Sequence, residues 1–307
     1  MILCFNDEQR EKHLYNSRMY SCSYETCHGK TDGHYISYFK NGTKKAEGDF
    51  ENNYRIGKWT VWDSTGHMVL QREYENPFFF KCLYPKPQTN VPDSSQYRIQ
   101  YNKEGYIDYF KLKEEMVVWS KRLWRFVPES KNLLNFDNGR LFQNFQKNIQ
   151  NKNIIAYSVA DDEFKTALTS DQIPSSNLRI IGFKIKEDAF TDNIRKVLET
   201  RIIGICPVVI NTVKKDTSDL YWLYYPELRP ILAKEKLEAK FITPKIKSFD
   251  DLFFFRNFSS SIYKESNVYN RSIADYKKGV DIEREAEKIE IGIIEYEYDC
   301  WVWFLKH

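Results

Sequence analysis

The chain has 307 residues, 42% of them hydrophobic and 16% aromatic, which is long enough for roughly two domains and too rich in ring surface for a disordered protein. Its 46 basic and 43 acidic residues give a net charge of +3 without any strongly basic block, which excludes a nucleic-acid or membrane-surface footprint. No apolar stretch approaches the ~18–20 residues of a membrane span, and no signal peptide is visible.

Glycines crowd the N-terminal part, where six of the 12 lie between residues 29 and 66. An aromatic residue followed by a turn occurs at 38–42 and again at 61–66. Asn41-Gly42 predicts a type I′ turn, because that turn needs two residues that tolerate positive φ. A period of about 20–25 residues predicts stacked hairpins.

Residues 33–76 resemble the MORN-variant repeat in three elements. These are aromatic-x-Asn-Gly, then Glu47-Gly48-Asp49-Phe50, then Gly57-Lys58-Trp59-x-x-Trp62. The resemblance implies a protein-interaction module. A plain β-meander explains the same residues equally well.

A polar stretch with three prolines divides the chain at 85–95. We expect a β-hairpin repeat module at 1–84, a linker at 85–96 and a second domain at 97–307. Separate folding of the two would leave a stable fragment of residues 97–307 after proteolysis of the linker. Residues 97–110 predict one more hairpin, out of phase with the repeat.

The second domain mixes helices and strands. Apolar spacing predicts a helix from Met116 to Phe126, closed by Pro128, and a shorter one at 142–149. Strands are expected where β-branched and aromatic residues gather, at 154–159, 179–186, 197–210 and 220–225.

Two helix signals follow. Ser248 and Asp251 resemble a capping box, opening a helix whose face carries Leu252, Phe255, Ser259 and Ile262. The last helix carries an apolar seam flanked by Glu285, Glu287 and Glu290; its members are Ile282, Ala286, Ile289, Ile293, Tyr296, Cys300 and Trp303. It docks on the domain core or, alternatively, pairs with a partner helix. The fold class expected is α+β: an antiparallel β-hairpin module, then a mixed domain ending in a long helix.

Catalytic residues are scarce. There are five histidines and none between residues 68 and 306, so the larger domain lacks a His-based triad or base, and no nucleotide or nucleophile motif occurs. We expect an inert protein with no cofactor. Cys206 and Cys300 read as core residues, whereas Cys22 and Cys27 are able to pair in an oxidising compartment.

One metal alternative remains in the first module. Cys22, Cys27, His28 and His34 are the residue types of a tetrahedral zinc site, although their spacing is not a standard one. A metal-dependent enzyme is the third functional alternative, disfavoured by the histidine count.

From about residue 113 to 307 the chain resembles the GldN/PorN family of the type IX secretion and gliding-motility apparatus. The matching blocks, in the family's order, are VWSKRLWR at 118–125, DDEFKTALT at 161–169, RIIGICP at 201–207, LYWLYYPELRPILA at 220–233 and RNFSSSIYKESN at 256–267. The family is typified by an opening Trp-Ser-Lys-x-x-Trp helix and by Pro where this chain has Ala167. The region between Asp171 and Lys184 looks shorter than usual, and the MORN-like module replaces a Pro-rich lead.

The resemblance implies a non-enzymatic periplasmic component, peripheral to the outer membrane, in a ring of copies with a lipoprotein of the GldK/PorK type. It also implies contact with inner-membrane motor proteins of the GldL/GldM type, and neither nucleic acid nor a small-molecule substrate. The runner-up is a MORN-type adaptor that has kept the scaffold but lost ring assembly.

Exposed aromatic and Arg side chains are the usual hot spots of such contacts. The candidates are Trp119, Trp124, Tyr224, Tyr225, Arg229, Tyr263, Lys264 and Asn267. Pro226 starts a helix after the strand that ends at Tyr225, which places Arg229 on a rigid corner. Arg229 either contacts a partner, so that Arg229→Ala weakens assembly without changing the melting temperature, or forms a structural salt bridge.

Overall fold

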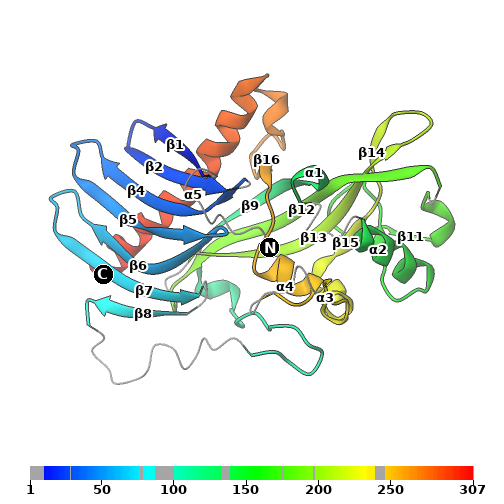
Figure 1. The fold of residues 1–307 in the computed structure, drawn as a ribbon, viewed down its shortest axis with the longest axis horizontal. Helices are drawn as coiled ribbons and strands as arrows, with labels where there is room; N and C mark the ends of the chain where they lie inside the picture. Colours follow the sequence, from blue (N-terminus) through cyan, green and yellow to red (C-terminus); the bar gives the residue numbers. More distant parts are fainter. Residues whose placement is uncertain are drawn as a thin grey trace.

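The computed structural model describes residues 10–27, 29–76, 79–86, 100–132, 139–174, 176–195, 198–238 and 246–306. Two antiparallel sheets lie side by side, small helices flank the second sheet, and a long C-terminal helix runs behind the first (Figure 1). This arrangement confirms the predicted α+β class. Within the described residues, no helix has the length and apolar character needed to cross a membrane.

The first sheet is a meander in which consecutive strands pair. Its strands are β1 (Glu11–Asn16), β2 (Tyr20–Cys27), β4 (Gly33–Phe39), β5 (Lys44–Glu51), β6 (Tyr54–Trp62), β7 (Met68–Asn76) and β8 (Phe79–Tyr84), with the short β3 (Lys30–Thr31) beside β2. One face is aromatic and buried, and it includes Tyr35, Phe50 and Trp59. Stacked hairpins are therefore confirmed over 33–76.

The turn chemistry differs from the prediction. Gly42 has a φ of 82°, and the Phe39 N–H donates to the Thr43 carbonyl at 2.8 Å, but Asn41 is not in the left-handed region. One left-handed glycine closes this turn, as in a hairpin with a glycine bulge, so the predicted type I′ turn is wrong here. Asn52 and Asn53, with φ of 50° and 71°, form the two-residue turn with positive φ instead.

The second sheet has the order β11-β10-β15-β13-β12-β9-β16, with β14 beside β13. The strands are β9 (Val117–Pro128), β10 (Ala156–Tyr157), β11 (Ala167–Leu168), β12 (Leu178–Asp192), β13 (Leu198–Asn211), β14 (Thr217–Asp219), β15 (Trp222–Tyr224) and β16 (Ser261–Glu265). The helices are α1 (Glu129–Asn132), α2 (Arg140–Gln150), α3 (Tyr225–Lys234), α4 (Phe249–Phe254) and α5 (Val280–Lys306), with 3-10 turns at 114–116, 170–172 and 273–275.

Most elements expected in this half are present. β12, β13 and α2 cover the predicted 179–186, 197–210 and 142–149, while the strands expected at 154–159 and 220–225 shorten to β10 and β15. A β-bridge between Tyr101 and Ile107 confirms the hairpin within 100–110.

The helix predicted from Met116 to Phe126 is wrong, because Met116 ends a 3-10 turn and residues 117–126 lie in β9. The segment is rich in β-branched and aromatic residues, which suit a strand buried on both sides. Leu123 faces α5, whereas its neighbour Trp124 faces the opposite side of the sheet. β9 pairs along its full length with residues 182–192 of β12, and this pairing stabilises the extended form over the helix that the apolar spacing predicts.

The capping box at Ser248 is confirmed, since Ser248 Oγ accepts a hydrogen bond from the Asp251 N–H at 3.2 Å. The helical face predicted beyond it is wrong. α4 ends at Phe254, and Arg256 then takes a left-handed φ of 48°, a conformation that terminates helices. Ser259 therefore lies in a loop and Ile262 on β16.

The C-terminal helix α5 is confirmed and lies between both sheets. Ala286, Ile289 and Ile293 of the predicted seam pack against the second sheet. A second apolar face, with Ile291, Tyr298 and Trp301, packs against the first sheet. The docking alternative therefore holds for the seam, and the helix is apolar on two sides because both are buried.

Two further glutamates of α5, Glu295 and Glu297, form ion pairs with the first sheet. Lys45 Nζ lies 2.8 Å from Glu295, and Arg55 Nη2 lies 2.5 Å from Glu297. Both carboxylates are buried and both cations come from the first sheet. Polar contacts thus tie the first sheet to α5 in addition to the apolar face.

The boundary at 85–96 stays a prediction, since residues 87–99 lie outside the described ranges. The shared helix nevertheless bears on the fragment 97–307. That fragment retains α5 but exposes the face that packs on the first sheet. We therefore expect it to be unstable alone, contrary to the expectation from the linker.

Two glycine substitutions are expected to have opposite effects. A Cβ at Gly48 would lie 2.3 Å from the Trp59 ring, so Gly48→Ala is expected to destabilise the chain by about 1–3 kcal/mol. A Cβ at Gly292, within α5, meets only the Tyr20 hydroxyl at 4.0 Å, so Gly292→Ala is expected to stabilise by about 0.5–1 kcal/mol. Urea unfolding of both variants checks the pair; equal midpoints would contradict this account of the packing.

Candidate interaction site

A cluster of aromatic and lysine side chains covers the face of the second sheet that α5 does not touch. Trp124, Cys206 and Trp222 form its buried centre, and Tyr157, Phe164 and Tyr263 pack around them. With Lys184, Lys186 and Lys264 these residues are called the aromatic–lysine cluster. They come from strands β9, β10, β12, β13, β15 and β16 and from the loop at 161–164.

The loop at 161–164 closes one side of this cluster. Trp124 Nε1 donates to Asp162 Oδ2 at 2.5 Å. Lys186 is buried, and its ammonium donates to the Asp162 carbonyl at 2.6 Å and to Asp162 Oδ1 at 3.1 Å. The acidic loop therefore pairs a lysine that would otherwise be buried without a counter-charge.

Phe164 anchors the loop in an unusual backbone conformation. Its φ is 56°, which a bulky residue rarely adopts. The ring packs edge-on against Tyr224, with centroids 5.3 Å apart, and it covers Gly204 so closely that a Cβ there would lie 2.5 Å from it. Glycine is thus required at position 204, because the Phe164 ring leaves no space for a Cβ there.

Lys264 and Tyr263 extend the cluster toward solvent. The Lys264 ammonium lies 4.3 Å from the centre of the Trp124 ring, a cation–π contact, and Lys184 lies 5.3 Å from the Tyr263 ring. Burial raises the pKa of the Cys206 thiol, so it is a packing residue and not a nucleophile.

The residues predicted as partner contacts therefore fall into two groups, one exposed and one packed inside the fold. Tyr224, Tyr263, Lys264 and Asn267 are partly or fully exposed near the cluster. Trp124 is buried within it, and Trp119 packs on Tyr296 of α5 with ring centroids 4.5 Å apart. These two tryptophans therefore hold the fold together and are not free contact residues.

Tyr225 and Arg229 are also buried, which corrects their place among the surface candidates. Arg229 Nε and Nη2 donate to the two oxygens of Asp250, each at 2.9 Å, and Nη2 also donates to the Ile107 carbonyl at 2.7 Å. Tyr225 Oη donates to the same carboxylate at 3.1 Å. The structural salt bridge, one of the two alternatives for Arg229, is the one present.

Arg229→Lys is expected to lower the free energy of unfolding by about 1.5–3 kcal/mol, because a lysine keeps the charge but loses the two-pronged contact with Asp250. Thermal melting of the variant measures this. A melting temperature equal to that of the parent chain would return Arg229 to the list of partner contacts.

An exposed turn at residues 267–271 follows β16, and only its first residue, Asn267, was predicted as a contact residue. Asn267 Nδ2 donates to the Arg271 carbonyl at 2.7 Å and Asn267 Oδ1 accepts from the Arg271 N–H at 3.0 Å, which fixes the turn. At its end Val268 and Tyr269 are 98% and 74% exposed, and the Arg271 guanidinium lies 4.6 Å from the Tyr269 ring. The sequence signal was an apolar pair directly after the matched family block.

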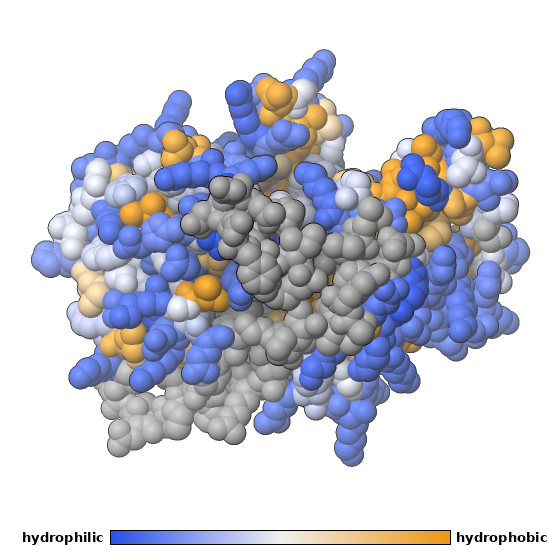
Figure 2. Space-filling view, viewed as in Figure 1, coloured by the Kyte–Doolittle hydropathy of each residue, from blue (hydrophilic) through white to orange (hydrophobic). Residues whose placement is uncertain are grey.

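Figure 2 shows one face of the molecule, on which hydrophilic residues predominate and apolar ones form small patches at protruding ends. Such scattered residues are ordinary on a soluble surface. What distinguishes the 267–271 turn is that its apolar residues sit on a hydrogen-bonded frame.

A charged clamp joins the second sheet, the 256–261 loop and α5. Glu187 is buried and binds Arg125 Nε at 2.5 Å and Arg256 Nη1 at 2.7 Å, while Arg125 Nη1 also reaches Glu290 at 2.6 Å. Burial would raise the pKa of Glu187, but the guanidinium groups of Arg256 and Arg125 outweigh it and lower that pKa below its usual value. The carboxylate therefore stays ionised in the interior.

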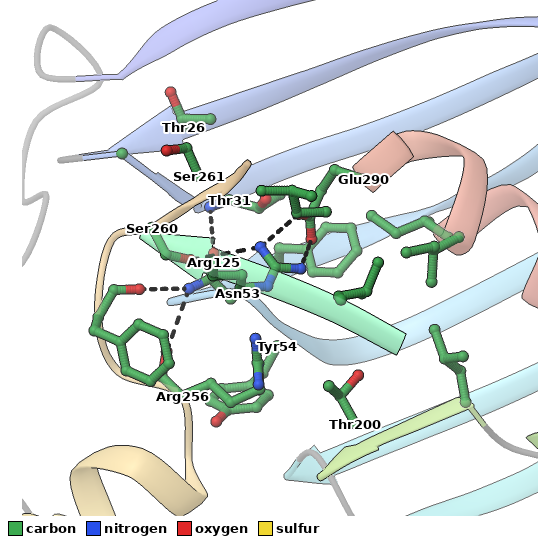
Figure 3. Close-up of a pocket in the computed structure, with 18 of the residues that line it drawn as sticks. Thr26, Thr31, Asn53, Tyr54, Arg125, Thr200, Arg256, Ser260, Ser261 and Glu290 are labelled. Carbon is green, nitrogen blue, oxygen red and sulfur yellow. Dashed lines mark hydrogen bonds and ion pairs between the residues drawn. The ribbon is translucent and has the colours of Figure 1, made fainter. Parts of the chain in front are cut away.

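A cavity of about 470 Å³ lies beside this clamp, where the two sheets and α5 meet (Figure 3). Arg125, Asn53 and Glu290 line it from three different elements. It separates the charged clamp from the aromatic face of the first sheet.

Two residues of the zinc alternative, Cys27 and His34, have other partners in this structure. Cys27 is disulfide-bonded and Cys22 is a free, buried thiol, so the Cys22–Cys27 pair that the sequence left open is not formed, and Cys27 is unavailable to a metal. His34 instead contacts Asp49 at 3.1 Å, and His28 lies outside the described residues. Among the described side chains no group of three metal-ligating residues is present.

Comparison with known proteins identifies the second half. The model of the family described as gliding motility associated protein GldN matches residues 112–180 and 173–302. No curated protein matches the chain significantly. All five blocks quoted from the sequence lie inside the matched range, and all five contribute to the aromatic–lysine cluster: Trp124, the 161–164 loop, Cys206, Trp222, and Tyr263 with Lys264. The chain therefore belongs to the GldN family, whose members are structural components of the gliding-motility and type IX secretion machinery.

Proposed function

We propose that this chain is a periplasmic assembly component that joins a ring of copies beneath the outer membrane. Its partners are a lipoprotein of the GldK/PorK type and motor proteins of the GldL/GldM type. The family match supports a place in this machinery. The disulfide at Cys27 supports an oxidising compartment such as the periplasm.

One observation favours a specific surface as the contact with a partner. The family blocks meet in the aromatic–lysine cluster, and the last block runs directly into the exposed turn at 267–271. Tyr263, Lys264 and Tyr224 lie on the exposed side of that cluster. A fixed, exposed Tyr and Arg next to an apolar residue has the composition of a binding hot spot.

Tyr269→Ala is expected to weaken binding to the lipoprotein partner by about thirtyfold, because truncating a hot-spot side chain costs about 2 kcal/mol or more. The melting temperature should stay unchanged, since Tyr269 is 74% exposed. Affinity pull-down from the periplasm and electron microscopy of ring-sized particles measure the effect.

The matched control is Tyr84→Ala, another exposed tyrosine, on the edge strand of the first sheet. Equal loss in both variants, or no loss in Tyr269→Ala, would reject this surface. Persistent rings in Tyr269→Ala would show that the turn serves another contact.

The second candidate function is a MORN-type adaptor. The stacked turns favour it: Asn41 Nδ2 donates to the Ser64 carbonyl at 2.8 Å and so joins equivalent positions of the two repeats. Such regular stacking is typical of repeat modules that bind partners. Lipoprotein binding that is lost with Trp62→Ala, but not with Tyr269→Ala, would favour the adaptor.

A further inference from the structure

The cavity between the sheets is lined by polar and aromatic residues from both halves of the chain. Thr31 belongs to the first sheet, Thr200 to β13 and Ser261 to β16, and α5 provides the opposite wall (Figure 3). Its volume of about 470 Å³ lies within the roughly 300–1,000 Å³ range of small-molecule sites.

Most charged groups around the cavity already contact other groups of the protein. Arg125 and Arg256 share Glu187, and Arg55 binds Glu297. Among the carboxylates, Glu290 binds Arg125, Glu199 binds Arg201 at 2.6 Å, and Glu287 accepts a hydrogen bond from the Tyr24 hydroxyl. Lys131 and Glu283, both exposed at the rim, are of opposite sign. Among the described residues, the lining thus holds four cations and four carboxylates, and this balance favours neither an anionic nor a cationic ligand.

Three hydroxyl groups around the cavity are not used, whereas those of Tyr24, Thr26 and Ser260 bind Glu287, His13 and Arg125. Within the described part of the chain, the side-chain hydroxyls of Thr31, Thr200 and Ser261 have no hydrogen-bond partner, although each can donate one bond and accept two. The rings of Tyr54, Tyr109 and Phe258 lie beside them. The groups left free to bind a ligand are thus neutral hydroxyls that lie next to flat apolar rings.

We propose that this cavity binds a neutral, polyhydroxylated ligand, a saccharide of one or two rings. Its hydroxyls would exchange hydrogen bonds with Thr31, Thr200 and Ser261. The apolar face of a sugar ring would rest on an aromatic side chain, whose negatively polarised face attracts C–H groups. Because the lining comes from both sheets, binding would also stabilise their relative placement.

The test is calorimetric titration of the full chain with N,N′-diacetylchitobiose, cellobiose, glucose and glucose 6-phosphate. We expect one of the neutral disaccharides to bind and glucose to bind more tightly than its phosphate. The double variant Thr31→Val and Thr200→Val should weaken binding about tenfold or more, because two hydrogen bonds are lost. Thr217→Val, on the exposed strand β14, is the matched control and should bind as the parent does.

Three results would overturn the proposal. One is that no neutral disaccharide binds at millimolar concentration. Another is that glucose 6-phosphate binds more tightly than glucose, which would assign the site to anions. The third is an unchanged affinity in the double variant with an unchanged melting temperature. None of these readouts depends on ring assembly or on a protein partner, so the saccharide site and the proposed function fail independently.

Discussion

Glu187→Ala is expected to lower the free energy of unfolding by about 3–5 kcal/mol, since removing one partner of a buried ion pair leaves the other buried charge uncompensated. Glu187 is fully buried, and it is the shared partner of Arg125 and Arg256. Urea unfolding at neutral pH measures the loss. Glu283→Ala, on the exposed start of α5, is the control and should unfold as the parent does.

The ion pairs of Glu187 also predict that the free energy of unfolding depends on pH. The pKa of Glu187 is lowered in the folded chain, so its contribution to stability is complete above the unfolded glutamate value of about 4.3 and is lost as the pH falls through the lower folded value. The difference in stability between the parent and Glu187→Ala should therefore shrink on acidification. A difference that stays constant down to the acid unfolding of the parent would contradict the assigned direction.

Trp59→Ala is expected to destabilise the chain by about 3–5 kcal/mol, because it empties the centre of the first sheet's core. Trp59 is completely buried, its ring packs with Phe50 at 4.9 Å and with Tyr298 of α5 at 6.0 Å, and its indole N–H donates to the Asp49 carbonyl at 3.0 Å. Since α5 is shared by both sheets, we expect both halves of the chain to melt together at the lower temperature. Differential scanning calorimetry measures the number of transitions.

Trp62→Ala is the matched control for this prediction. Trp62 lies on the same strand but is only partly buried, with the Lys44 ammonium 5.2 Å from its ring. Its loss should cost much less than that of Trp59. A first transition that involves only the first sheet in Trp59→Ala would show that the sheets unfold separately.

How far the sequence predicts this fold depends on whether the determining contacts are local. The capping box at Ser248 and the closing glycines at Gly42 and Gly66 act within a few residues, and each marks the boundary it predicts. β9 is different: its apolar spacing suits a helix, and only pairing with β12, some 60 residues away in sequence, decides for a strand.

The candidate site shows the same limit. The sequence left Arg229 open between a partner contact and a salt bridge, because Asp250 is brought to it only by the packing of α4 on α3. The pairing of the 161–164 loop with Lys186 also depends on contacts distant in sequence. By contrast, the exposure of Asn267 follows from a turn-forming sequence directly after the short strand β16.

The position of α5 affects how the chain folds as it is synthesised. The helix follows both sheets in chain order, yet it covers the aromatic face of the first sheet and the Leu123 side of the second. During synthesis or export, from the N-terminus onward, two large apolar surfaces therefore remain uncovered until the last segment arrives. Holding factors would be needed most at that stage, and a chain shortened by this one segment would leave both of these faces uncovered, although the main core of the second half contains no residue of α5.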